Sequence, residues 1–176
     1  MWVDYSVHIL SQFMQEPREA HMEAVKRVLC YLKGNLGQEI LLRSNFNFKI
    51  VVFCDSDWEA CPITTRSLIG YLVTLGGSSI SWRNKKQTTV SHSSAEAEYR
   101  AMATVTSDLI WIKSFLASMR VFVKHHMQLF YDNQVGLHIA KNPMFQSRTK
   151  HVEIDYHFVR KRLLSRELVM RYVPSN

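Results

Sequence analysis

The order of the hydrophobic segments after residue 48 constrains the fold most strongly. FKIVVFC at 48–54 is almost wholly apolar, which is typical of a central strand covered on both faces. Gly76–Gly77 joins two further strand-like segments, LIGYLVTL and SISWR, and predicts a β-hairpin. The remaining expected elements are a long helix from Ser94 to about Met119, a strand at 127–132, a short helix at 133–142, a helix at 151–165 and a strand at 168–173. A meander followed by strand–helix–strand alternation predicts an α/β fold with a mixed sheet and flanking helices.

The first 47 residues have a different pattern. Residues 17–33 are expected to form an amphipathic helix with Pro17 in its first turn and Gly34 at its end. Its apolar stripe consists of Met22, Val25, Val28, Leu29 and Leu32. A short strand at 38–44 and a turn at 44–47 follow. None of these residues suggests chemistry, so the segment is an appendage or the end of something larger.

The composition is that of a globular protein with a polyanionic partner. The 176 residues carry a formal net charge of +7 and are 47% hydrophobic. Lys and Arg are concentrated after Lys141, which favours nucleic acid, although a solvated helix face explains the same run. Three cysteines without a CxxC pair favour reduced thiols in an intracellular protein over a disulfide frame or a zinc site. We expect no signal peptide and no membrane span.

Two acidic residues follow predicted strands. Asp55 closes the apolar strand at 48–54, and Asp132 closes the strand at 127–131. If the two strands are parallel neighbours, both carboxylates emerge at the same edge of the sheet, where open α/β sheets build their sites. For either residue alone, a turn or capping role is the simpler explanation.

Glu98 is selected by helical register. Met102, Val105, Leu109, Ile112 and Leu116 follow it at alternating steps of four and three, so Glu98 lies on the core-facing stripe. Glu96 instead has capping-box spacing with Ser93 and projects from another face with Arg100. A carboxylate on an apolar stripe requires a partner, and Arg100, Lys86 or a bound cation would serve.

Three converging acids repel one another unless a cation relieves the conflict. Oxygen ligands of this kind suit Mg²⁺ or Mn²⁺. Two such ions can activate water and stabilise the leaving oxygen of a phosphodiester, which also accounts for the basic surface. Asp55, Glu98 and Asp132 are therefore predicted to be catalytic metal ligands.

Four segments carry a resemblance to a known family: FCDSDW (53–58), TRSLIGYLVTLGGSSISWRNKKQTTVSHSSAEAEYRA (65–101), LFYDNQ (129–134) and RTKHVEIDYHFVR (148–160). They closely resemble the ribonuclease H domain of copia-type LTR retrotransposon Pol polyproteins. SQFM (11–14) and HMEAVKRVLCYLKG (21–34) resemble the end of the preceding reverse transcriptase region. The resemblance implies residues 1–47 as that tail and residues 48–176 as a ribonuclease H-like domain with a five-stranded sheet.

The resemblance also implies an activity and a partner. The family hydrolyses the RNA strand of RNA–DNA hybrids with Mg²⁺ or Mn²⁺, and its acidic motifs correspond to Asp55, Glu98 and Asp132. Asp57 would share a face with Asp55 and is a further candidate ligand or substrate contact, the alternative being a solvated turn residue. Expected nucleic-acid contacts are Arg83, Lys85, Lys86, Asn133, Lys150 and His151. Trp58 and Trp82 either stack on nucleic acid or pack in the rim of the core.

The sequence departs from the family pattern in three ways. The family's fourth acidic ligand lies in a C-terminal helix beyond the YVPSN end of this chain, so that helix is expected to be missing. The polymerase palm with its paired aspartates is also absent, and Glu59–Ala60 stands where relatives carry Ala–Gly. Two functions therefore stay open: an active ribonuclease H, or an inactive retroelement fragment that at most binds nucleic acid. The rest of the Pol polyprotein is the expected protein partner, in a cytoplasmic particle or the nucleus.

Overall fold

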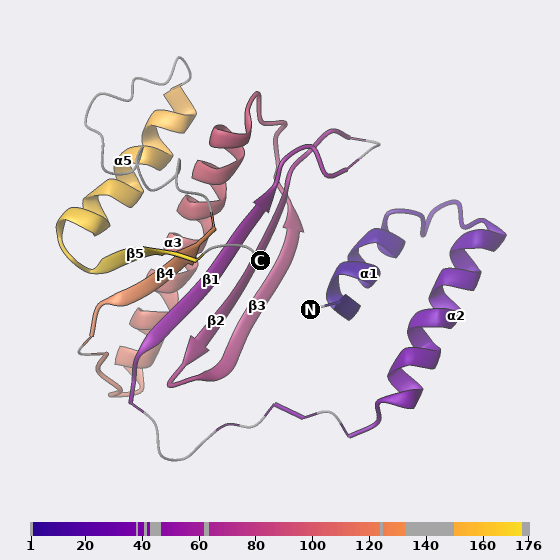
Figure 1. The fold of residues 1–176 in the computed structure, drawn as a ribbon, viewed down its shortest axis with the longest axis horizontal. Coiled ribbons are helices and arrows are strands. Elements are labelled where there is room, and N and C mark those ends of the chain that lie inside the picture. Colours follow the sequence, from indigo (N-terminus) through magenta and orange to yellow (C-terminus); the bar gives the residue numbers. More distant parts are fainter. Residues whose placement is uncertain are drawn as a thin grey trace.

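The chain builds one five-stranded sheet with helices around it (Figure 1). The computed structural model describes residues 2–37, 39, 40, 42, 47–61, 64–123, 125–132 and 150–173. In chain order the elements are α1 (Trp2–Ser11), α2 (Glu19–Gly34), β1 (Ile50–Asp57), β2 (Leu68–Leu75), β3 (Ser78–Lys86), α3 (Ser94–Ser118), β4 (Met127–Tyr131), α5 (Lys150–Leu164) and β5 (Leu168–Tyr172).

The sheet has the order β3-β2-β1-β4-β5 and is mixed. β1, β2 and β3 form an antiparallel meander, whereas β4 runs parallel to both β1 and β5. Gly76 and Gly77, both with positive φ, form the β2–β3 turn, because glycine adopts this conformation without a Cβ clash. The predicted hairpin, mixed sheet and five strands are confirmed.

One face of the sheet forms the core with α3 and α5. Along β1 the residues Ile50, Val52 and Cys54 are buried on this face. The stripe predicted for α3 is also buried, and its members Met102, Val105 and Leu109 are fully inaccessible. Tyr99 of α3 and Tyr156 of α5 meet edge to face with ring centroids 6.0 Å apart, which joins the two helices. The hydrophobic period of 3.6 residues thus fixes which side of α3 faces the sheet.

The opposite face of the sheet is largely open. Phe53 is 46% exposed and stacks on Phe130, with ring centroids 5.2 Å apart. The expectation that β1 is covered on both faces is therefore wrong, because its odd-numbered side chains point away from α3. The helices α1 and α2 lie beyond β3 (Figure 1), and Lys86 Nζ donates to Gln12 Oε1 at 2.6 Å after α1.

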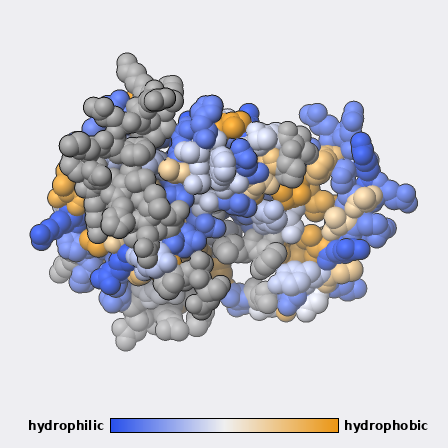
Figure 2. All heavy atoms as spheres, turned by 45° about the horizontal axis from the view of Figure 1, so that its top comes forward, coloured by the Kyte–Doolittle hydropathy of each residue, from blue (hydrophilic) through white to orange (hydrophobic). Residues whose placement is uncertain are grey.

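The N-terminal region differs from expectation in three respects. The helix α1 was not predicted. The helix α2 matches the predicted 17–33 helix, but none of its residues is buried, and Met22, Leu29 and Leu32 of its stripe are exposed. Figure 2 shows hydrophobic side chains at the surface on this side of the molecule. The predicted strand at 38–44 is wrong at residues 39, 40 and 42, which have no regular structure; its other residues, like the predicted helix at 133–142, lie outside the described residues.

Candidate functional site

Asp55 and Asp132 lie on two adjacent parallel strands, at the edge where the pairing of the two strands stops. The sequence predicted that Asp55 closes its strand, but β1 continues to Asp57, whereas Asp132 directly follows β4. The register of β1 and β4 pairs Cys54 with Tyr131, so Asp55 and Asp132 each follow a paired residue. The condition set by the sequence, that these strands are parallel neighbours, is met. The two acids therefore lie at the carboxyl edge of the sheet, where open α/β sheets place ligands.

Both residues line a cavity of about 460 Å³ on the open face of the sheet. Asp57 lines the same cavity, and the stacked Phe53 and Phe130 form part of its wall. Gly70 is the register partner of Asp55 on β2, and a Cβ built on it would meet no atom within 4 Å. A glycine at this position therefore keeps the space beside Asp55 open.

The carboxylates at this edge of the sheet repel one another. Partial burial, the negative charge of Asp132 and that of Asp57 raise the pKa of Asp55, although a backbone hydrogen bond at Ser56 lowers it in part. Burial and the carboxylates of Asp55 and Asp132 also raise the pKa of the Cys54 thiol. Cys54 is thus a protonated core residue, as expected, since a nucleophilic thiol requires a lowered pKa.

Glu98 approaches the same region from the other side of the sheet. It lies in the second turn of α3 with only 6% of its surface exposed. Burial raises the pKa of the Tyr131 phenol, and the nearby charges of Cys54, Glu98, Asp55 and Asp132 raise it further. Tyr131 lines the cavity, whereas Glu98 does not.

Glu96 takes part in the N-terminal cap of α3, as its spacing predicted, but its carboxylate accepts from the His92 N–H instead of the Ser93 N–H of a capping box. Ser93 Oγ accepts a hydrogen bond from the Glu96 N–H at 3.2 Å, which caps α3. The Glu96 carboxylate accepts from the His92 N–H at 2.9 Å and pairs with Arg100 at 2.7 Å. Arg100 is therefore engaged by Glu96, and Lys86 by Gln12.

A divalent cation fits the chemistry of this donor set. Asp55 and Asp132 are hard oxygen donors. Burial and then repulsion by Asp132 raise the pKa of Asp55, and a bound cation would remove that repulsion. In the part of the chain that the structure describes, however, no three His, Cys, Asp or Glu side chains are grouped closely enough to hold one ion. The structure thus brings Asp55, Asp57 and Asp132 to one cavity and leaves Glu98 next to it.

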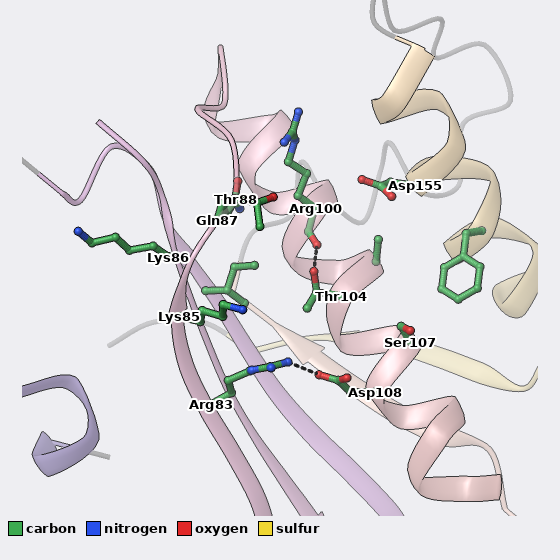
Figure 3. A pocket seen from close by; sticks show the side chains of 13 residues that line it. Arg83, Lys85, Lys86, Gln87, Thr88, Arg100, Thr104, Ser107, Asp108 and Asp155 are labelled. Carbon is green, nitrogen blue, oxygen red and sulfur yellow. Dashed lines mark hydrogen bonds and ion pairs between the residues drawn. The ribbon is translucent and has the colours of Figure 1, made fainter. Parts of the chain in front are cut away.

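Of the six expected nucleic-acid contacts, three lie near the end of β3 and two at the start of α5. Arg83 and Lys85 are exposed near the end of β3 and point towards α3, whereas Lys86 points away (Figure 3). Lys150 and His151 begin α5, and Asn133 lies outside the described residues. Trp58 is 42% exposed and its Nε1 donates to the Ser91 carbonyl at 3.1 Å; Trp82 is 45% exposed.

Two features of this region were not predicted. Gly70 could be identified only from the β1–β2 register, which places it opposite Asp55. Asp108 of α3 accepts hydrogen bonds from the Tyr71 hydroxyl at 2.5 Å and from Arg83 at 3.2 Å. Burial, together with this hydrogen bond to Asp108, raises the pKa of Tyr71 to about 12.

The mixed five-stranded sheet with its flanking helices is the fold of a ribonuclease H-like domain. Among solved structures, LC11-RNase H1 isolated from compost matches 72% of this chain and 85% of its own, with a TM-score of 0.53 and 16% identity. A foamy viral protease-reverse transcriptase in complex with dsDNA matches 92% of this chain and 30% of its own, with a TM-score of 0.51 and 13% identity. At these identities the likeness shows the shared fold.

The sequence comparisons give the family. The chain is 38% identical over 174 residues to the retrovirus-related Pol polyprotein from transposon RE1 of Arabidopsis thaliana, and 32% identical over 174 residues to that from transposon TNT 1-94 of Nicotiana tabacum. Both alignments cover 99% of the chain, which therefore belongs to the copia-type retrovirus-related Pol polyproteins. It spans only 12% and 13% of these two relatives. No protein-family model matches the chain, and no helix among its described residues could cross a membrane.

Proposed function

We propose that this domain is a metal-dependent ribonuclease H that hydrolyses the RNA strand of RNA–DNA hybrids. One observation carries the proposal: Asp55 and Asp132 follow the last paired residues of two adjacent parallel strands and line one cavity, with Glu98 buried on α3. Carboxylates in conflict at the edge of an α/β sheet are typical of a site that binds a cation.

The residues have separate roles in this proposal. Asp55 and Asp132 hold Mg²⁺ or Mn²⁺, Glu98 supplies the third carboxylate, and Asp57 is a further ligand or substrate contact. When bound, the metal activates water and stabilises the leaving oxygen of the phosphodiester. Arg83, Lys85 and Lys86 contact the backbone of the hybrid, together with Asn133, Lys150 and His151.

The wider setting is part of the same proposal. Residues 1–47 form the tail of a reverse transcriptase region, and residues 48–176 form the ribonuclease H-like domain. The exposed apolar stripe of α2 supports the first assignment, because an apolar helix face is normally covered by other protein. The partner would be the rest of the Pol polyprotein, and the location intracellular, in a cytoplasmic particle or the nucleus.

The test is cleavage of a hybrid with its RNA strand labelled. Wild type is incubated with Mg²⁺ or with Mn²⁺, beside Asp132→Asn and a control variant Lys33→Ala on the exposed surface of α2. We expect metal-dependent cleavage by wild type and Lys33→Ala, and a loss of at least about a hundredfold in Asp132→Asn, as is common when a charge-stabilising group is removed. Equal cleavage by wild type and Asp132→Asn would refute the proposed site.

A second function is favoured by the lack of a three-carboxylate group among the described side chains. In this alternative the domain binds nucleic acid without cleaving it. Hybrid binding by wild type in the presence of Mg²⁺ and Mn²⁺, with no cleavage above the Asp132→Asn background, would support it. Metal-dependent cleavage by the chain as it stands would exclude it.

A further inference from the structure

A groove runs between β3 and α3, on the side of the sheet that faces away from Asp55. It consists of two cavities of about 480 and 490 Å³ that share Arg83 and Asp108 as lining residues. The ion pair between these two residues, at 3.2 Å, therefore marks the boundary between its halves. We refer to the two cavities together as the β3–α3 groove.

The half near the start of α3 is basic and polar (Figure 3). Arg83 and Lys85 enter it because they alternate with Asn84 and Lys86 along β3 and pair with the core-side residues of β2. Arg100 lines it from α3, where it also pairs with Glu96. The groove also contains the hydroxyl groups of Thr88, Thr104 and Ser107, and two acids, Asp108 and Asp155.

The half near the end of α3 is aromatic. Trp111 is 65% exposed and Phe115 is 50% exposed. Their rings lie parallel within 5°, with centroids 5.4 Å apart, and both line the groove opposite Ile80 of β3. Two large exposed rings presented flat beside a basic cluster are unusual for a surface that contacts only water.

We propose that the β3–α3 groove binds a single strand of nucleic acid. Phosphates lie against Arg83, Lys85 and Arg100, and bases stack on Trp111 and Phe115. Basic grooves with aromatic platforms bind single strands in this way, because a base can stack on a side chain only when its face is not covered by a neighbouring base pair. The chain's net charge of +7 complements the occupant.

The length of the groove is consistent with this occupant. The helical rise from Arg100 to Phe115 is about 22 Å, which accommodates about six stacked nucleotides at the spacing of one strand. Arg83 and Tyr71 line both the groove and the cavity that contains Asp55 and Asp132, but the α3 residues that line the groove do not line that cavity. Strand binding therefore does not require the cleavage proposed above. An acidic protein segment would also satisfy the cations, but it would not require both aromatic rings.

The test measures fluorescence anisotropy of a labelled 20-nucleotide oligothymidylate in EDTA over a series of salt concentrations. We expect Trp111→Ala to weaken binding about tenfold, since one stacked base is worth about that much. Lys85→Ala should weaken binding at low salt, because it removes one phosphate contact. Lys85→Ala should also reduce the slope of log affinity against log salt by about 0.7. Tyr31→Ala and Lys33→Ala on α2 are matched aromatic and charge controls and should bind like wild type.

Three results would overturn the proposal. They are the absence of binding by wild type at low salt, unchanged affinity in both Trp111→Ala and Lys85→Ala, and equal affinity for the oligothymidylate and a blunt duplex of the same length. Asp132→Asn should bind the oligothymidylate like wild type. The cleavage proposal can therefore fail while this one holds, and the reverse.

Discussion

Glu96 and Glu98 are two residues apart on α3, but they should respond to mutation in opposite ways. Both are buried, with 8% and 6% of their surfaces exposed. Glu96 caps the helix and pairs with Arg100, whereas Glu98 lies beside Tyr131 near the carboxylate edge. We therefore expect Glu96→Ala to reduce stability, and Glu98→Gln to reduce cleavage while stability is kept.

The magnitude for Glu96→Ala follows from its contacts. Loss of the charged acceptor leaves the His92 N–H without this bond, at a cost of about 1–2 kcal/mol. The ion pair between Arg100 and Glu96 is partly buried, with 19% and 9% of the respective side chains exposed. Its loss should cost more than that of a surface ion pair and less than that of a fully buried one, about 1–2 kcal/mol. The free energy of unfolding should thus fall by about 2–4 kcal/mol. Glu98→Gln keeps the shape and a hydrogen-bonding oxygen, so its effect should be under about 1 kcal/mol.

Urea denaturation and thermal melting followed by circular dichroism would measure both effects. In a protein of this size the loss in Glu96→Ala corresponds to a melting temperature lower by about 5–15 °C. Glu96→Gln, which keeps one acceptor, should lie between Glu96→Ala and wild type. The reasoning is refuted if Glu98→Gln destabilises the protein more than Glu96→Ala, or if Glu96→Ala melts within 2 °C of wild type, roughly the shift expected for under 1 kcal/mol.

Three further predictions concern the surroundings of Asp55. Gly70→Val should place a side chain in the open space beside Asp55 and abolish hybrid cleavage with an unchanged melting temperature; full activity of the variant would show that this space is not used. Glu59, at φ 54°, occupies a left-handed conformation, so Glu59→Gly should raise the free energy of unfolding by about 0.5–1 kcal/mol, and a decrease would contradict this account. Because the pKa of Asp55 is raised, the native state binds more protons than the unfolded state between the ordinary and the raised pKa, and stability falls as pH increases through that window. Asp55→Asn should therefore be more stable than wild type at pH 7 but equally stable below the ordinary pKa of aspartate, as measured by urea denaturation across pH; equal stability at both would exclude a raised pKa.

Much of the fold could be predicted because each core element carries a clear period. The stripe from Met102 to Leu116 fixed the buried side of α3, and Gly76–Gly77 located the hairpin. The open face of β1 could not be predicted, because an apolar run such as IVVFC does not show whether a second layer covers it. The helix α1 was missed for a related reason, since ten residues with little burial give only a weak pattern.

The site was predictable at the level of residues but not of geometry. Helical register separated Glu96 from Glu98, and the strand ends selected Asp55 and Asp132. The sequence could not show that Asp55 lines the cavity whereas Glu98 does not, because that depends on which β1 side chains face α3. It also could not identify Gly70, whose role appears only once the β1–β2 register is known.

Two buried polar residues near the start of α3, Gln87 and Glu96, are satisfied by contacts within the fold, whereas Asp55 is not. Gln87 is buried, but its side-chain amide donates to the Ala97 carbonyl at 2.7 Å and accepts from the Ser91 hydroxyl at 2.7 Å. These hydrogen bonds offset the cost of burying the amide. The buried carboxylate of Glu96 likewise accepts hydrogen bonds from the His92 N–H and from Arg100. Asp55 differs, because the hydrogen bond at Ser56 does not overcome burial and the charge of Asp132, and its pKa stays raised. A bound cation would remove the repulsion between Asp55 and Asp132 without any change of residue. The raised pKa of Asp55 is therefore consistent with the proposed cation site at the edge formed by β1 and β4.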